Sequence, residues 1–360
     1  MFSRFAAMLA STIPYALLPR VAGIDVSRGS VRAVVKPQQA RDPAYDSVRI
    51  PLPEGAFIDG AIRAPQPIVE AVRTVRLKLG VTDAVASVAE QKAFVYQTLV
   101  PHDASLQYAI ESTLEAHIPL AAEGVVHDSE IVRTTPEGIL VAVTAFPRSD
   151  IESLQSVFSD AGIWLRAIET EAHAFARAVL SEVDRSQNVM LVDLGTYRTR
   201  IAIADHGTIS YSTTVDFGSA LFVAALMKHL HVSEAEAQAI RATRGFLLGT
   251  TNRDVVEALA GPVSVLRDEL ERHRAFWNHE SEIDLPRDPV SRILIAGSGA
   301  RTLGLAEYVS DVLGVPVARA EVWQGSAESS GRVPRMSADE SLEYVTAIGL
   351  SARASPVRPW

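Results

Sequence analysis

The sequence predicts an α/β protein built from two related lobes, and three observations lead to this prediction. The chain has 360 residues, about twice the size of a common domain, which favours two domains or one two-lobed fold. A strand–turn–strand pattern whose first strand ends on an aspartate occurs twice, with Asp25 and Asp193 separated by almost half of the chain. Strand-like and helix-like segments alternate between and after the two copies.

The composition is that of a folded protein and excludes several classes. Hydrophobic residues make up 48% and charged residues 21%, which argues against disordered, collagen-like and coiled-coil proteins. The absence of cysteine excludes disulfide scaffolds, thiolate metal sites and cysteine nucleophiles. A formal net charge of −9 argues against nucleic acid as a partner, because nucleic-acid binding needs a basic surface.

The two ends of the chain are predicted to be extensions of the folded part. Residues 1–20 are mildly apolar, but Pro14 and Pro19 interrupt them, and no stretch approaches the roughly 20 apolar residues that span a bilayer. We favour a short extension packed on the first lobe over a signal peptide or a helix lying on a membrane surface. Residues 355–360 form the second predicted extension.

The first element is a hairpin over residues 21–35, and residues 189–203 repeat it. In each copy an apolar strand ends at the aspartate, a turn rich in small and hydroxyl residues follows, and a second strand begins. Backbone N–H groups in such a turn can surround an anion, and an aspartate at the strand end can hold Mg²⁺ through its waters. Two matched copies favour a clamp on the phosphates and magnesium ion of a nucleotide over two unrelated hairpins with common turn residues.

Hydrophobic periodicity places the remaining elements. In the first half of the chain it predicts helices at 68–79, 106–117 and 150–161, and strands at 84–88, 94–99 and 138–145. In the second half it predicts helices at 220–230, 233–243 and 254–277, followed by an exposed loop at 325–334.

A third turn, Gly297-Ser298-Gly299-Ala300, follows a short strand at 291–296 and precedes a predicted helix at 302–313. Its spacing differs from the dinucleotide fingerprint G-x-G-x-x-G, because the third glycine is Gly304. The sequence contains no P-loop motif. A turn of this kind suits close backbone approach to a ribose or a base, or anion binding at the start of the helix.

Together these segments resemble the actin-like ATPase superfamily and, within it, the PilM family of type IV pilus assembly, which is related to FtsA. The resemblance extends over most of the chain: the two hairpins, Ile118-Pro119-Leu120, residues 169–178 and the closing segment 347–353 follow the order of the family. It implies a two-lobed actin-like ATPase fold, a duplicated ribonuclease H-like fold, with a small inserted α+β subdomain. The implied boundaries are 21–187 for the first lobe, about 90–160 for the insertion and 188–354 for the second lobe.

The resemblance also implies ATP and Mg²⁺ as ligands, with Asp25 and Asp193 next to the metal. The implied nucleotide contacts are Asp25, Ser27, Arg28, Gly29, Ser30 and Arg32 in the first hairpin, Asp193, Gly195, Thr196, Tyr197 and Thr199 in the second, Gln238 and Arg241 near the nucleoside, and Gly297, Ser298, Gly299 and Ala300 in the third turn. The chain departs from the family where Ser27 replaces a glycine, Arg28 follows it, Arg32 replaces a lysine, and Gln238 and Arg241 replace a glutamate and a lysine. These departures weaken the expectation of ATP hydrolysis more than the expectation of ATP binding.

Glu171 and Asp193 are the candidate catalytic residues. Glu171 begins a predicted helix before the second lobe. In actin-like ATPases an acidic or amide residue near this junction orients the attacking water. The alternative is that Glu171 has no catalytic role and stands at this position because the helix dipole stabilises a negative charge at a helix N-terminus.

By resemblance, the protein is expected to be an ATP-binding cytoplasmic scaffold, peripheral at the inner membrane through its partners. The implied partners are a short N-terminal segment of a PilN-like inner-membrane protein and components of the assembly platform or motor, with self-association left open. Two alternatives stay open: a small-molecule kinase with the same core, and a membrane-tethered filament former of the division type. The second would carry a C-terminal amphipathic helix, which residues 351–360, with two prolines, do not predict.

Overall fold

The computed structural model describes residues 20–37, 45–247, 249, 252–279, 283, 285–323 and 336–353. Apart from Arg20, the predicted extension at 1–20 lies outside these residues, as do the predicted extension at 355–360 and the predicted loop at 325–334.

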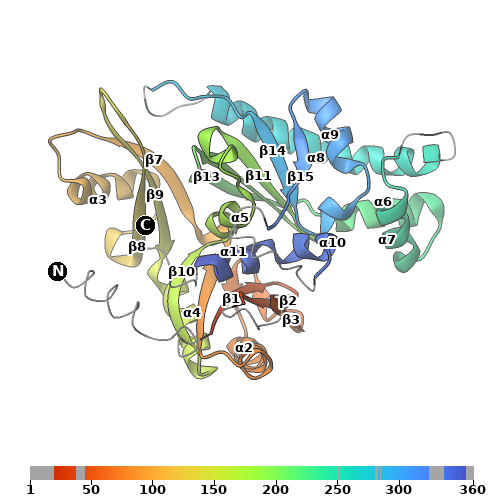
Figure 1. Cartoon of the computed structure of the whole chain (residues 1–360), viewed down its shortest axis with the longest axis horizontal. Helices are drawn as coiled ribbons and strands as arrows, with labels where there is room; N and C mark the ends of the chain where they lie inside the picture. The colour runs from red at the N-terminus through yellow and green to blue at the C-terminus, as the bar shows by residue number, and fades with distance from the viewer. Residues whose placement is uncertain are drawn as a thin grey trace.

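Two five-stranded sheets form the body of the molecule (Figure 1). The strands of the first sheet are β1 (Val21–Ser27), β2 (Ser30–Val35), β3 (Asp46–Pro51), β6 (Asp83–Val88) and β10 (Trp164–Thr170), in the order β10-β6-β1-β2-β3. Those of the second are β11 (Val189–Leu194), β12 (Thr199–Asp205), β13 (Thr208–Val215), β14 (Arg292–Ala296) and β15 (Val317–Arg319), in the order β13-β12-β11-β14-β15.

The two sheets have the same topology. In each, three consecutive strands form an antiparallel meander, and two later strands add in parallel beside the first. Strands β1, β6, β11 and β14 read as continuous apolar runs because helices cover both faces of the sheets, and nearly all of their residues are buried. The predicted duplication is thus present as two equivalent sheets, and the α/β class is confirmed.

A third, smaller sheet lies beside the second one. Its strands are β7 (Phe94–Val100), β9 (Gly138–Pro147) and β8 (Val125–Thr135), in that order, and helix α3 (Leu106–His117) covers it over a separate apolar cluster. Strand β8 escaped the sequence analysis because most of its side chains are exposed or half-buried, so no apolar run marks it. Its sheet packs against β13.

The remaining helices surround the sheets. They are α2 (Pro65–Leu79), α4 (Arg148–Asp160), α5 (Glu171–Val179), α6 (Ala220–Leu230), α7 (Glu234–Thr243), α8 (Arg253–His279), α9 (Leu305–Leu313), α10 (Ala338–Ser341) and α11 (Val345–Arg353). The short strands β4 (Phe57–Ile58) and β5 (Ala61–Ile62) form a small ribbon. The 3₁₀ turns are η2 (Glu90–Lys92), η3 (Ala122–Gly124), η4 (Asp184–Ser186), η6 (Ser298–Arg301) and η7 (Leu342–Tyr344).

Helix α9 begins three residues later than predicted. The segment after the third turn first forms the 3₁₀ turn η6, and Gly304 then takes a left-handed conformation with φ of 71° directly before the helix. A residue with positive φ lies outside the α-helical region, so the helix begins at Leu305.

Helix α4 shares the core of the first sheet. Its buried residues Leu154, Val157 and Phe158 pack in the same apolar cluster as α2 and β6. Helix α4 falls within the insertion expected at about 90–160, yet it packs with the first sheet. The boundaries of the insertion stay a prediction.

Helices α5 and α11 lie side by side between the two large sheets (Figure 1). Helix α5 buries Phe175 and Val179 in the core of the second sheet, whereas α11, from the end of the chain, lies against β1 and β2 of the first sheet. Each half of the chain therefore supplies a helix to the sheet of the other half.

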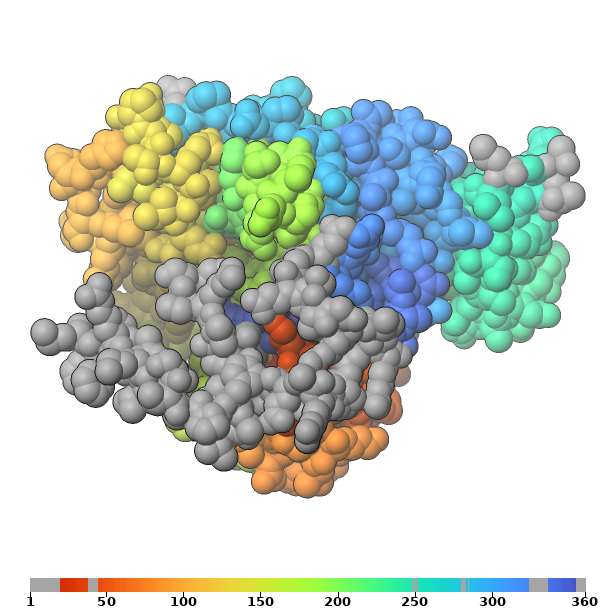
Figure 2. All heavy atoms as spheres, in the orientation of Figure 1, coloured from red at the N-terminus to blue at the C-terminus, as the bar shows by residue number. Residues whose placement is uncertain are grey.

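The third sheet and the α6–α7 pair lie at opposite ends of the molecule, as the orange-yellow and turquoise surfaces in Figure 2 show. None of the described helices is both long and apolar enough to span a bilayer.

Candidate functional site

The two duplicated hairpins place an acid and an arginine opposite one another in the same way. In the first hairpin Asp25 of β1 lies across from Arg32 of β2, and in the second Asp193 of β11 lies across from Arg200 of β12. Arg32 Nη1 is 3.5 Å from Asp25 Oδ2, and Arg200 Nη2 is hydrogen-bonded to Asp193 Oδ2. Both aspartates are buried, so each carboxylate meets a guanidinium from the neighbouring strand.

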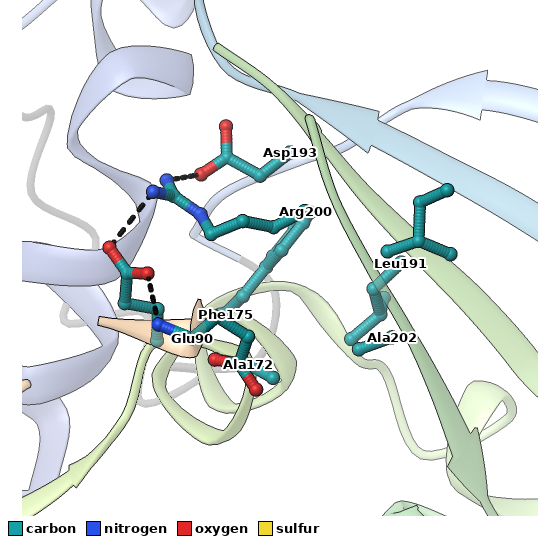
Figure 3. A pocket seen from close by; sticks show the side chains of 9 residues that line it. Glu90, Ala172, Phe175, Leu191, Asp193, Arg200 and Ala202 are labelled. Carbon is teal, nitrogen blue, oxygen red and sulfur yellow. Dashed lines mark hydrogen bonds and ion pairs between the residues drawn. The ribbon is translucent and has the colours of Figure 1, made fainter. Parts of the chain in front are cut away.

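Arg200 connects the second hairpin to the start of helix α5 (Figure 3). Its Nη1 donates to Glu171 Oε1 at 2.9 Å, while Nη2 donates to Asp193. The other oxygen of Glu171 accepts the backbone N–H of Glu90 at 2.9 Å, and Glu90 Oε2 in turn accepts the backbone N–H of Ala172 at 3.0 Å. Residues from η2, α5, β11 and β12 thus meet in one buried polar cluster.

Burial controls the protonation of these acids. Burial raises the pKa of Glu171 to about 8, because the positive charge of Arg200 is outweighed and Asp25 and Glu90 add negative charge nearby. Burial also raises the pKa of Asp25, although Arg32 and Arg200 oppose the shift. Burial works against the charge of Arg200, but Asp193 and Glu171 hold the Arg200 pKa above its usual range. The raised pKa brings Glu171 close to the range in which a carboxyl exchanges a proton at neutral pH.

The turns of the two hairpins touch. The guanidinium of Arg28 lies over the ring of Tyr197, 4.6 Å from its centroid, and comes within 3.8 Å of Glu54. Within the first turn, Ser27 Oγ donates to the carbonyl of Ser30 at 2.9 Å, so Ser27 occupies the glycine position by closing the turn itself. Arg28 and Tyr197 together bridge the gap between the hairpins.

The third turn packs directly on the second hairpin. Ser298 Oγ lies 3.2 Å from Thr196 Oγ1 and 3.0 Å from Ser219 Oγ. Gly297 has φ of 84°, and a side chain at this position would collide with Asp193 Oδ1, so only glycine allows this approach. Gly299 is pressed against Leu194 in the same way.

Other predicted residues of these turns have structural roles. Thr199 Oγ1 is buried and donates to the carbonyl of Phe217 at 2.8 Å. The backbone of Gly195 bonds to Arg198 and Ser219, which fixes the loop of the second hairpin. Gly29 is exposed, and Ala300 is buried beneath the third turn.

The two predicted nucleoside contacts differ in orientation. Gln238 is exposed and bonds along helix α7 to Glu234 at 3.2 Å, so it does not reach the buried cluster. Arg241 is 9% exposed, and its Nε and Nη1 are buried without a hydrogen-bond partner among the described residues. Burial and the nearby charge of Arg301 lower the pKa of Arg241. Because an unpaired buried cation is costly, this guanidinium is suited to meet a ligand.

The comparison with family models decides the family of the chain. Residues 23–355 match the model described as "Type IV pilus assembly protein PilM". The chain belongs to this family. No curated protein sequence matches it significantly.

Solved structures agree with the fold predicted for a PilM-family protein. A chain of the "PilM-PilN type IV pilus biogenesis complex" aligns with a TM-score of 0.70 and 18% identity over 94% of this chain and 99% of that one. The ethanolamine utilization protein EutJ of Carboxydothermus hydrogenoformans aligns with a TM-score of 0.54 and 15% identity, over 96% and 93% of the two chains. An MreB protein of Spiroplasma citri bound to AMPPNP aligns with 0.52 and 12%, over 87% and 96%. The actin-like fold is confirmed.

Three residues of the candidate site escaped the sequence analysis: Arg200, Glu90 and Arg49. Arg200 was detectable, because the spacing from Asp25 to Arg32 recurs from Asp193 to Arg200. Glu90 joins the site because its backbone N–H donates to Glu171, which lies 81 positions further along the chain. No sequence pattern predicts this contact. Arg49 lies across from Arg32 on strand β3, which was not predicted.

Arginines already pair with the two aspartates that were expected next to a magnesium ion. No group of three or more His, Asp or Glu side chains in the described part of the chain is arranged to hold a metal. Asp193 and Glu171 both bind Arg200, whereas Asp25 Oδ1 and Glu90 Oε1 are buried carboxylate oxygens without a hydrogen-bond partner among the described residues. The expected Mg²⁺ at Asp25 and Asp193 stays a prediction, and no chemical step is derived through it.

Proposed function

We propose that this PilM-family protein is an ATP-binding scaffold of type IV pilus assembly that holds its nucleotide between the two hairpins and the third turn. The observation that carries the proposal is that the first hairpin, the third turn with the residue after it, and helix α7 each hold buried polar groups without a partner among the described residues, beside the unpaired acceptors Asp25 Oδ1 and Glu90 Oε1. Arg32 Nε, Ser30 Oγ, Thr302 Oγ1 and two nitrogens of Arg241 are buried without a partner among the described residues. A nucleotide offers oxygen and nitrogen acceptors to such donors. The similar MreB structure is bound to AMPPNP, which supports the proposal.

The same geometry supports slow or absent hydrolysis. Both oxygens of Glu171 already accept hydrogen bonds, one from Arg200 and one from the backbone N–H of Glu90, which leaves fewer positions at which an attacking water could be held. We therefore assign Glu171 and Asp193 a positioning role, acting through Arg200.

The proposed partner is a short N-terminal segment of an inner-membrane PilN-like protein, with further contacts to the assembly platform or motor. The similarity to a chain of the PilM–PilN complex supports this partner. In this proposal the protein is cytoplasmic and reaches the membrane through the partner. The two lobes, 21–187 and 188–354, would move about the α5–α11 pair and so connect nucleotide binding to docking.

Titration of labelled ATP into the purified protein tests the nucleotide site. We expect saturable binding, which weakens about tenfold in Arg241→Ala because a buried charged donor is lost. The matched control is Arg253→Ala, whose arginine is exposed on α8 and pairs only along the helix. Absence of saturable binding would refute the nucleotide site, and ADP release that depends on a small acceptor would favour a kinase.

A pull-down tests the partner. Peptides with the N-terminal sequences of inner-membrane pilus proteins should capture the protein, and scrambled peptides of the same composition should not. Equal capture by both sets would contradict the proposed docking.

A further inference from the structure

The negative charge of the molecule is concentrated on the third sheet and helix α3. Residues 94–147, which form this unit, contain seven acids and one cation, Arg133, so they carry six of the nine net negative charges of the chain. Arg133 does not offset the acids, because it pairs with the buried Asp205 of the second lobe. All seven acids are exposed. Two are on α3, and the others are Asp103, Glu123, Asp128, Glu130 and Glu137.

Exposed acids elsewhere have arginine partners, and those of the third sheet and α3 do not. On helix α8, Glu257, Asp268, Glu269 and Glu271 each pair with an arginine of the same helix. In residues 94–147, all of which the structure describes, no exposed acid pairs with a lysine or arginine. This segregation leaves one end of the molecule with a negative field that attracts a cationic partner.

The outer face of helix α3 carries its charge at a cost to the helix. Tyr108, Glu111, Ser112 and Glu115 follow the spacing of one helix face and are exposed, opposite the buried residues that pack on the third sheet. Glu111 and Glu115 repel one another one turn apart. Glu115 also stands in the last turn, where the helix dipole disfavours negative charge. Local stability therefore does not account for these acids.

Apolar side chains stand among these charges. Tyr108 is 74% exposed on α3, and Ile131 of β8 is 57% exposed. Ile131 lies across from Val141, which is buried in the cluster beneath α3, so Ile131 is on the α3 side of the third sheet. Figure 1 shows α3 at the end of the molecule, away from the two hairpins, so a partner can reach it without entering the region between them.

We propose that the outer face of α3, with the exposed acids around it, docks a segment of a partner protein that is rich in lysine and arginine and also carries apolar residues. The cations pair with Glu111 and Glu115, and an arginine or apolar side chain covers the ring of Tyr108. The same negative charge repels nucleic acids and anionic lipid surfaces, which favours a basic polypeptide as the occupant. The inference goes beyond the nucleotide and the PilN-like segment of the proposed function and depends on neither.

A labelled peptide of repeating Lys-Leu-Ala-Lys tests the surface on the full chain by fluorescence anisotropy, with a peptide in which glutamate replaces lysine as the control. We expect saturable binding of the lysine peptide only. Its affinity should fall at least about tenfold between about 0.1 M and about 0.5 M NaCl, because salt screens exposed charges. Bound peptide should also slow hydrogen exchange in α3. Absence of saturable binding, or slower exchange confined to other helices, would overturn the inference.

The double variant Glu111→Gln/Glu115→Gln separates this surface from the net charge of the molecule. Its affinity for the lysine peptide should fall at least about fivefold. The matched control is Glu307→Gln/Asp311→Gln, which removes the same charge at the same spacing from exposed positions of α9 and should leave the affinity within about twofold. The α3 variant should keep its Tm, because the repulsion between its acids is relieved. Equal losses of affinity in the two double variants would show that the peptide responds only to net charge and would overturn the inference.

Discussion

Glu171 is a residue on which burial and a single arginine act in opposite directions. The outcome is a pKa of about 8, well above that of an exposed glutamate, with Arg200, Asp25 and Glu90 as its charged neighbours. A carboxyl whose folded-state pKa is raised contributes stability below its unfolded-state pKa and loses it as pH rises through the folded-state value. Stability should therefore decline between about pH 5 and pH 8 because Glu171 ionises in place.

Glu171→Gln should reduce this pH dependence. We expect the fall in Tm between pH 6 and pH 9 to be smaller than in the unmodified protein by about 2 °C or more. Glu169→Gln is a control of opposite sign. Burial favours protonation of Glu169, but Arg177 and Arg353 outweigh it and lower the Glu169 pKa, so its contribution disappears as pH falls. Equal Tm profiles for Glu171→Gln and the unmodified protein would contradict the assignment.

Tyr197, in the turn of the second hairpin, contacts Arg28 in the turn of the first hairpin. A cation–π contact at an exposed site contributes about 0.5–1 kcal/mol, so Tyr197→Ala should speed release of labelled nucleotide about two- to fivefold in a stopped-flow measurement. Tyr108→Ala, an exposed residue on α3, serves as the control. An unchanged release rate would show that the contact does not restrain the nucleotide.

At the scale of elements, the packing of helix α11 depends on close approach of its backbone to helix α5 and to strand β1. A Cβ at Gly349 would overlap the backbone oxygen of Ala174 on α5, and one at Gly23 would overlap the backbone of α11. Gly349→Ala should therefore lower the free energy of unfolding by about 1–3 kcal/mol or more in urea titration, because neither helix can move away without opening the core. Gly261→Ala on α8 is the matched control, since nothing lies near its position and alanine should be neutral or stabilising there.

The elements also show which parts of the fold can be predicted from the sequence. Both hairpins and the long helices were predictable, because apolar periodicity and the Asp-ended strands are local signals. Strand β8 was not, because its side chains are largely exposed, and α9 begins late because Gly304 turns the backbone first. In the candidate site, Asp25 and Asp193 follow from local pattern, whereas Glu90 depends on a contact between distant elements that no local pattern encodes.

At the scale of the whole molecule, a buried carboxylate fastens the third sheet to the second lobe. Asp205, at the end of β12, is 1% exposed and accepts Arg133 Nη1 from β8 on both oxygens, at 3.0 and 3.1 Å. It also accepts Gln97 Nε2 from β7 at 3.0 Å and lies 2.8 Å from His206 Nδ1. A displacement of the second lobe would therefore carry the third sheet with it.

Arg133→Gln should loosen this attachment without unfolding either lobe. Removal of one partner from a buried charge-assisted pair costs about 1–3 kcal/mol, so hydrogen exchange at β7, β8 and β9 should become about tenfold faster, while β11 and β14 keep their protection. Arg166→Gln is the matched control, because it breaks a 2.7 Å pair with Asp83 in the first sheet, away from Asp205. If exchange stayed unchanged in the third sheet, or rose equally throughout the second lobe, Asp205 would not be the link between them. The expected pattern makes the third sheet a rigid attachment of the second lobe, so that movement between the lobes shifts its position relative to the first sheet.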